Sequence, residues 1–153
     1  WPVPEDAQLA LFEAELAAAQ EHSLPILVHD REAHAETYAL LKRYRPRGIL
    51  HAFSGSADDA LWIARQGMLL GFGGALTFKN ARRAVEAVAA LSLENIVLET
   101  DCPYLAPEPH RGTRNSSLNL PLVAAQIAAL KGISEDEVTE TTFRNAKRFY
   151  GID

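Results

Sequence analysis

The sequence has very little cysteine and methionine and no long apolar run, and each of these absences excludes a class of protein. One of its 153 residues is cysteine and one is methionine. A single cysteine cannot form an intramolecular disulfide, which excludes a disulfide-stapled secreted domain and favours a reducing compartment. No apolar stretch of the chain approaches the ~20 residues that span a bilayer. We therefore expect a cytoplasmic protein with no membrane partner.

The chain also lacks an excess of positive charge. Its formal net charge is −5, so recognition of phosphate requires a local basic patch rather than a global field. Hydrophobic residues make up 48% of the chain and charged residues 23%, which suits one folded domain and excludes a disordered chain. The sequence begins with Trp1, and its only methionine is Met68. We therefore expect it to be a piece of a longer protein.

Short apolar runs alternate with helical patterns along the chain. The runs predict strands at residues 26–29, 48–51, 68–72 and 95–100. Helical spacing and capping signals predict helices at residues 6–21, 31–45, 56–66, 80–91, 120–131 and 135–150. Strands that alternate with helices in this way form a parallel sheet with right-handed crossovers. The remaining segment, residues 102–119, is longer than an ordinary connection, and loops of such length are often functional.

Three of the predicted strands lead into residues that can bind a metal ion. His29 and His51 end two of the runs, and Asp101 follows a third. Taken singly, each histidine is more often a structural side chain than a ligand. Enzymes with parallel sheets place their chemistry at the carboxyl ends of the strands, and imidazole and carboxylate suit zinc or manganese. The shared position of the three residues therefore favours a metal site.

Glu99 lies two residues before Asp101 in the same predicted strand. Because side chains alternate along a strand, the two carboxylates point to the same side. A carboxylate in the interior needs a partner, and a ring nitrogen of a ligand histidine is one candidate. We expect Glu99 to act behind the metal ligands, and an ion pair with Arg31 or Lys79 is the alternative.

Three arginines accompany the predicted metal site. Arg31 follows His29 by two residues, while Arg111 and Arg114 lie in the long loop. Guanidinium groups match phosphate oxygens in a bidentate fork, so the cluster indicates an anionic substrate group. A solvated arginine pair that braces the loop is the alternative.

Two further features of the predicted strand ends are ambiguous. Gly71, Gly73 and Gly74 permit either a close approach of the backbone to a ligand, a positive φ, or relief of crowding in a barrel interior. Cys102 follows Asp101 directly and therefore points to the other side. We expect Cys102 to serve in packing.

Five stretches of the sequence together form a distinctive set of motifs. They are LPILVHDREA (24–33), HAFSGS (51–56), GFGGALTFKNA (71–81), LETDCPYLAPEPHRGTRN (98–115) and TTFRNAKRFYGI (141–152). In their order, and most specifically in the stretch at residues 98–115, they resemble the TatD family of metal-dependent deoxyribonucleases, and together they cover most of the chain.

The resemblance implies an α/β fold, namely a TIM-type (β/α)8 barrel of the metal-dependent hydrolases. This chain supplies about strands 5 to 8 of that barrel and their helices, so residues 1–153 form a single domain that is the C-terminal half. Family members carry an N-terminal His-x-His and a metal-bridging glutamate, which this sequence does not contain. The expected partner is the missing N-terminal half of the barrel, or another copy of the chain.

The resemblance also implies a reaction. The family hydrolyses phosphodiester bonds in DNA with metal-activated water, and we expect exonuclease action with two divalent ions, Mg, Mn or Zn, in a complete site. His29, His51 and Asp101 match the metal ligands of the family, and Asp101 also matches its catalytic proton acceptor. The alternatives are an amidohydrolase-like esterase or lactonase, or a catalytically incomplete fragment that acts as an assembly partner.

The loop motif of the family has its counterpart in Arg111, Arg114 and Asn115. We infer that these three residues, together with Arg31, contact substrate phosphates.

Overall fold

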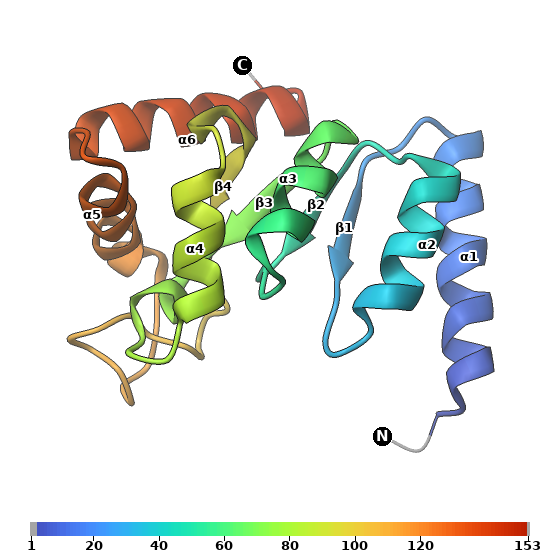
Figure 1. Cartoon of the computed structure of the whole chain (residues 1–153), viewed down its shortest axis with the longest axis horizontal. Helices are drawn as coiled ribbons and strands as arrows, with labels where there is room; N and C mark the ends of the chain where they lie inside the picture. Colours follow the sequence, from blue (N-terminus) through green and yellow to red (C-terminus); the bar gives the residue numbers. More distant parts are fainter. Residues whose placement is uncertain (1–2, 153) are drawn as a thin grey trace.

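The computed structural model describes residues 3–152, in which four parallel strands form one sheet (Figure 1). Each strand pairs with its neighbour in sequence, in the order β1-β2-β3-β4, and every pairing is parallel. This confirms the predicted parallel sheet. The strands are β1 (Ile26–His29), β2 (Gly48–His51), β3 (Leu69–Phe72) and β4 (Ile96–Leu98).

Helices connect the strands and complete the chain. No helix among residues 3–152 is both long and apolar enough to cross a membrane. The α-helices are α1 (Glu5–Glu21), α2 (His34–Tyr44), α3 (Ala57–Arg65), α4 (Arg82–Ala90), α5 (Leu120–Lys131) and α6 (Glu135–Tyr150). Short 3-10 helices occur at η1 (Gly74–Thr77), η2 (Leu93–Asn95) and η3 (Ser117–Asn119).

Two helices begin later than the sequence pattern predicts, and local hydrogen bonds explain both differences. Helix α2 begins at His34 because the Asp30 carboxylate accepts a hydrogen bond from the Ala33 N–H, and Glu32 has a left-handed φ of 59°. Helix α4 begins at Arg82 because a turn precedes it, in which the Ala81 N–H donates to the carbonyl of residue 78. Side chains and turns thus take the N–H groups that a longer helix would use.

The predicted helix caps are present to different extents. Ser56 and Asp59 form a complete capping box at α3, since the Ser56 hydroxyl accepts from the Asp59 N–H and the Asp59 carboxylate accepts from the Ser56 N–H. At α6 the Ser134 hydroxyl accepts from the Glu137 N–H, which is half of such a box. These bonds satisfy N–H groups that the first turn of a helix leaves unpaired.

One face of the sheet packs against helices. Val28, Leu50, Leu70 and Ile96 lie side by side in register across all four strands, and all four are buried. Full burial of such a side chain contributes about 1.5–3 kcal/mol. The main core therefore lies between the sheet and its helices, which contribute Leu41, Ile63, Val88 and Ile127.

The opposite face of the sheet is covered only in part. Helix α6 runs across the end of the sheet where the strands begin (Figure 1), and its Phe149 packs on Ile49 and Val97. The Arg47 guanidinium donates to the Phe149 carbonyl at 2.7 Å and lies over its ring. Leu27 on the edge strand β1 is 60% exposed. This face is covered by α6 at the end where the strands begin and is open along β1.

Asn145 joins α6 to the start of β4, and its removal tests that connection. The Asn145 side chain is fully buried, and its amide donates to the carbonyl groups of Leu93 and Ile96 at 3.0 and 2.9 Å. Asn145→Ala leaves both carbonyls without this donor, so we expect a loss of about 1–3 kcal/mol in the free energy of unfolding. Urea denaturation of the intact protein measures it. The exposed α6 substitution Glu140→Ala is the control, and equal stability of the two variants would contradict the prediction.

Candidate active site

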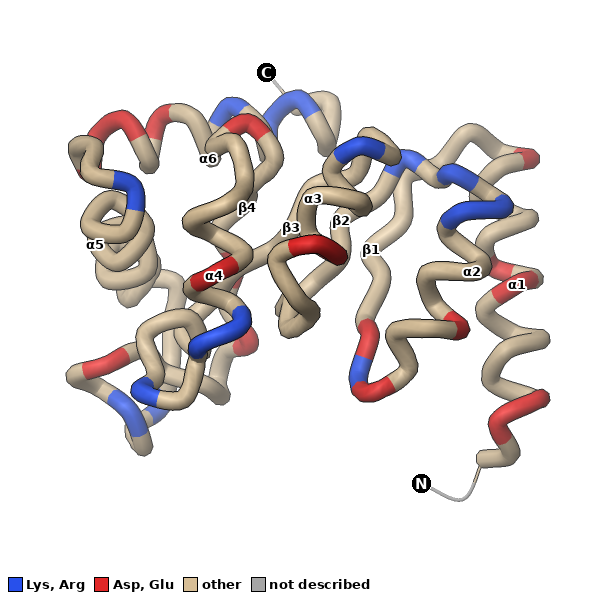
Figure 2. The backbone as a smooth tube through the Cα atoms, viewed as in Figure 1, with Lys and Arg blue, Asp and Glu red and all other residues tan. Residues whose placement is uncertain are grey.

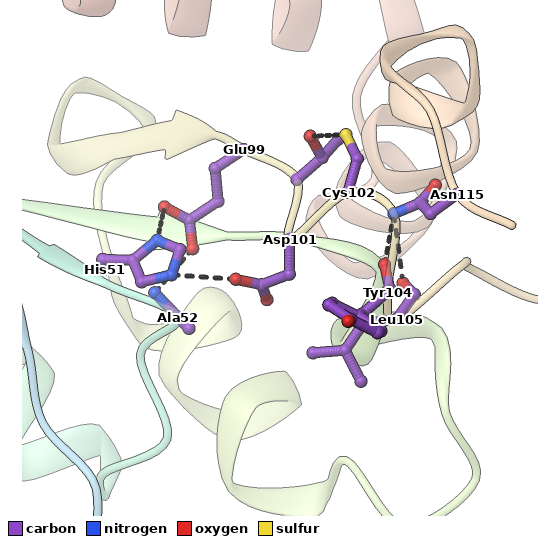
Figure 3. A network of polar contacts seen from close by, with 9 residues as sticks. His51, Ala52, Glu99, Asp101, Cys102, Tyr104, Leu105 and Asn115 are labelled. Atoms are coloured by element: carbon purple, nitrogen blue, oxygen red, sulfur yellow. Dashed lines mark hydrogen bonds and ion pairs between the residues drawn. The ribbon is translucent and has the colours of Figure 1, made fainter.

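The structure brings His29, His51 and Asp101 to one edge of the sheet. His29 and His51 are direct partners in the pairing of β1 with β2, and their ring centroids lie 5.7 Å apart. The Nε2 atom of His51 lies 2.9 Å from Oδ1 of Asp101, which follows β4 (Figure 3). His51 and Asp101 come into contact, and His29 lies beside the His51 ring, because parallel strands in register end at the same edge.

Glu99 contacts the second ring nitrogen of His51. Its Oε2 atom lies 2.8 Å from Nδ1 of His51, and its Oε1 atom accepts a hydrogen bond from the Ala52 N–H at 2.5 Å (Figure 3). The alternative partners, Arg31 and Lys79, form no ion pair with Glu99 among residues 3–152. The expected contact between Glu99 and a ring nitrogen of a candidate ligand is therefore present.

The pKa values of Glu99 and His51 are both raised, for different physical reasons. Burial raises the pKa of Glu99, and the contacts with His51 and the Ala52 N–H offset only part of this rise. Burial alone lowers the pKa of His51, but the hydrogen bonds and charges of Glu99 and Asp101 outweigh it and raise that pKa. The neighbouring carboxylates therefore favour protonation of His51, and a cation that binds Nε2 competes with a proton there.

Glycine at position 71 makes room for the Glu99 carboxylate. A Cβ atom on Gly71 would lie 2.1 Å from Oε2 of Glu99. None of Gly71, Gly73 and Gly74 has a positive φ, so the interpretation as relief of crowding is the one that fits Gly71. A Cβ on Gly74 would lie 2.0 Å from the Leu105 carbonyl oxygen, which shows how closely η1 approaches the long loop.

The predicted phosphate contacts occupy different positions. Arg31, Arg111 and Arg114 are exposed, and the Arg111 guanidinium lies 4.2 Å from the ring centroid of Phe78. Asn115 is only 3% exposed, and its amide donates to the Tyr104 carbonyl at 2.9 Å (Figure 3). The Asn115 amide is thus taken up in bracing the loop, whereas the arginines can reach a ligand.

Phe78 and Cys102 depart from the sequence interpretation. Phe78 lies in the string GFGGALTFKNA, and no pattern in the sequence indicates that Arg111 packs on its ring. The expectation that Cys102 serves in packing is wrong. Its side chain is exposed and its Sγ lies 2.7 Å from the Thr100 hydroxyl, since the chain turns away from the sheet at Asp101.

Comparison with known proteins identifies the family. The model of the family described as TatD related DNase matches residues 2–151. The chain belongs to this TatD family. It is 39% identical over 153 residues to the uncharacterized metal-dependent hydrolase YabD of Bacillus subtilis, covering 98% of this chain and 60% of the relative. It is 32% identical to the 3'-5' ssDNA/RNA exonuclease TatD of Erwinia amylovora, covering 96% of this chain and 60% of that protein.

Solved structures agree with the family assignment. The crystal structure of YjjV, a TatD homologue from Escherichia coli, superimposes with a TM-score of 0.89 at 26% identity, covering 99% of this chain and 61% of that one. The fold is therefore that of the TatD-like TIM barrels. The chain spans about 60% of the length of these relatives.

The TatD site contains part of the donor set that a divalent ion needs. Among residues 3–152, no group of three or more His, Cys, Asp or Glu residues could hold a metal ion. His51 and Asp101 supply a nitrogen and an oxygen donor that converge to 2.9 Å. Glu99 on Nδ1 leaves Nε2 of His51 for the ion, as in carboxylate–histidine–metal arrangements. The residues fit one side of a metal site, with His29 beside it.

Removal of the Glu99 charge tests its role behind His51. We expect Glu99→Gln to weaken binding of Mn²⁺ or Zn²⁺ about 10–100-fold, because the ring loses the partner that orients it. Isothermal titration of the intact protein measures the affinity. Glu94→Gln, on the exposed surface of η2, is the matched control.

Gly71→Ala provides a second route to the same effect, because its Cβ would displace the Glu99 carboxylate without changing any ionisable group. Wild-type metal affinity in both Glu99→Gln and Gly71→Ala would show that Glu99 has no such role.

Proposed function

We propose that the protein to which this chain belongs hydrolyses phosphodiester bonds in single-stranded DNA by metal-activated water, as an exonuclease. The observation that carries the proposal is the His51–Asp101 pair at the strand ends, with Glu99 on the second ring nitrogen of His51. The family match and the name of the Erwinia amylovora relative, a 3'-5' ssDNA/RNA exonuclease, support it.

Each residue of the site has a distinct part in the proposed reaction. A bound divalent ion supplies Lewis-acid stabilisation of phosphate charge and lowers the pKa of water. Asp101, whose side chain is 28% exposed, can accept a proton from the attacking water as well as hold the ion. Glu99 fixes the orientation of His51. Arg31, together with the loop arginines, can hold flanking phosphates.

Asp101→Asn and metal removal test the reaction. We expect Asp101→Asn to lower the rate of nucleotide release from a labelled single-stranded DNA by about 10²–10⁴-fold, because the amide cannot accept the proton. We expect chelation to abolish release, and Mg²⁺, Mn²⁺ or Zn²⁺ to restore it. The exposed substitution Asp58→Asn is the control.

Cleavage that withstands both chelation and Asp101→Asn would rule out the proposed mechanism. Turnover of lactones or carboxylic esters without turnover of DNA would favour the esterase alternative instead.

We also propose that residues 1–153 act as the C-terminal half of a TatD barrel, supplying about strands 5 to 8. The open edge of β1, with Leu27 exposed and His29 beside it, supports a further strand and covering residues from the rest of the barrel. The length of the relatives supports the same arrangement. A half-barrel by itself exposes two sheet edges, which are rarely left unpaired.

A charge at Leu27 tests whether this face is covered in the intact protein. If it is covered, Leu27→Lys places an unpaired charge in the interior and lowers the free energy of unfolding by about 3–5 kcal/mol. Leu118→Lys, at an apolar side chain that is 88% exposed, should stay within about 0.5 kcal/mol of the wild type. An equally small effect at Leu27 would show that water covers the face. If the face is covered, the molar mass of the intact protein from light scattering shows whether the cover comes from the same chain or from a second copy.

A further inference from the structure

A cavity of about 490 Å³ opens directly beside the candidate active site. This volume falls within the range of about 300–1,000 Å³ that is typical of small-molecule sites. Asp101 lies at one side, and the cavity extends past the end of β3 to Phe78 and the start of α4. A ligand that fills it therefore reaches from the candidate metal ligand to a separate set of aromatic and basic side chains.

Phe78 forms a fixed aromatic wall of this cavity. Its N–H donates to the Ala75 carbonyl at 3.1 Å, and its carbonyl accepts from the Ala81 N–H at 3.0 Å. The neighbouring Thr77 hydroxyl donates to the Gly74 carbonyl at 2.7 Å and accepts from the N–H of residue 108 at 2.8 Å. The backbone that carries the ring is thus held before any ligand binds, which reduces the entropy cost of binding.

Arg111 packs on the Phe78 ring from the loop side. Its guanidinium carbon lies 4.2 Å from the Phe78 ring centroid, the geometry of a cation–π pair. Phe78 is only half-buried and lines the cavity, whereas Arg111 does not. Arg111 therefore covers part of the ring from outside and leaves ring surface facing the cavity.

Two arginines line the side of the cavity formed by the start of α4, where the helix dipole disfavours positive charge. Arg82 and Arg83 occupy the first turn of α4, which contains no acidic residue. The amino-terminal end of a helix carries partial positive charge, so cations there are unfavourable unless an anion is near. Arg82 pairs with Glu86 at 2.8 Å, while Arg83 forms no ion pair within the described part of the chain.

Basic residues of two segments lie close together along the backbone. Figure 2 shows blue positions at the beginning of α4 and on the loop that passes close to it, although the chain is acidic overall. A planar aromatic wall next to clustered guanidinium groups matches a base with its phosphate.

We propose that this cavity binds the nucleotide next to the scissile phosphodiester, with its base stacked on Phe78 and its phosphate at Arg82 and Arg83. This inference rests on the proposed nuclease function and assigns its substrate subsite. A base can stack on Phe78 only when it is free of a duplex, so the ligand is a single strand. Stacking accepts every base, so the subsite has little sequence preference.

Binding without turnover tests the stacking contact. The probes are a fluorescein-labelled thymidine decamer and a fluorescein-labelled abasic decamer of the same length. Fluorescence anisotropy with the intact protein gives the affinity for each probe, and a chelator in the buffer prevents cleavage. We expect Phe78→Ala to weaken binding of the thymidine decamer about tenfold and to leave binding of the abasic decamer unchanged. Phe78→Trp keeps an aromatic ring at this position and should retain the affinity. Phe143→Ala, which removes an exposed ring on α6, is the matched control.

The phosphate contact has a separate signature. We expect Arg83→Gln to weaken binding of both decamers and to reduce the slope of log affinity against log salt concentration by about 0.7, because one phosphate contact is lost. Arg65→Gln, an exposed arginine in the last turn of α3, should leave the slope unchanged.

The outcomes separate this inference from the function on which it rests. If the wild type cleaves DNA but Phe78→Ala binds both decamers as the wild type does, or loses both equally, the subsite is wrong and the nuclease function stands. If the wild type neither binds the thymidine decamer nor cleaves DNA, the nuclease function and the subsite both fail.

Discussion

The His51 imidazole is held through both of its ring nitrogens, and the candidate site is arranged around this one side chain. Glu99 contacts Nδ1 and Asp101 contacts Nε2, so two carboxylates from the segment after β4 hold a ring at the end of β2, two strands away. These contacts require β2 and β4 to end at the same level. They also require glycine at position 71, on the strand between them, because a Cβ there would collide with the Glu99 carboxylate. A carboxylate in this partly buried position is stable because it is paired.

The two faces of the sheet have different roles. The apolar row that runs across all four strands anchors the sheet to its helices and provides most of the burial. The other face carries the candidate site at the carboxyl edge and Phe149 at the opposite end. Its apolar residues near β1 remain in contact with water in this chain. The same face thus carries the candidate site and the surface that we propose the rest of a TatD barrel covers.

The proposed action on nucleic acid requires a local cluster of positive charge, because the chain is acidic overall. Here the polar loop after β4 folds back on η1, where the close approach at Gly74 and the Thr77 hydroxyl join the two segments. This contact brings Arg111 onto Phe78 and places the loop near the arginines of α4. A net charge of −5 and a basic patch are therefore compatible, because the attraction that matters acts over short distances.

Apolar runs and helical spacing predict the elements here well, because burial on a parallel sheet and on a helix face leaves a direct pattern in the chain. His29, His51 and Asp101 could also be selected from sequence, since strand ends are marked by the runs that precede them. Helix starts were less predictable, because the Asp30 carboxylate captures an N–H that propensity assigns to α2. The choice of His51 over Arg31 as the partner of Glu99, the exposure of Cys102 and the packing of Arg111 on Phe78 were decided only by the tertiary structure. Contacts between distant segments depend on register and loop path, and neither leaves a periodic signal in the sequence.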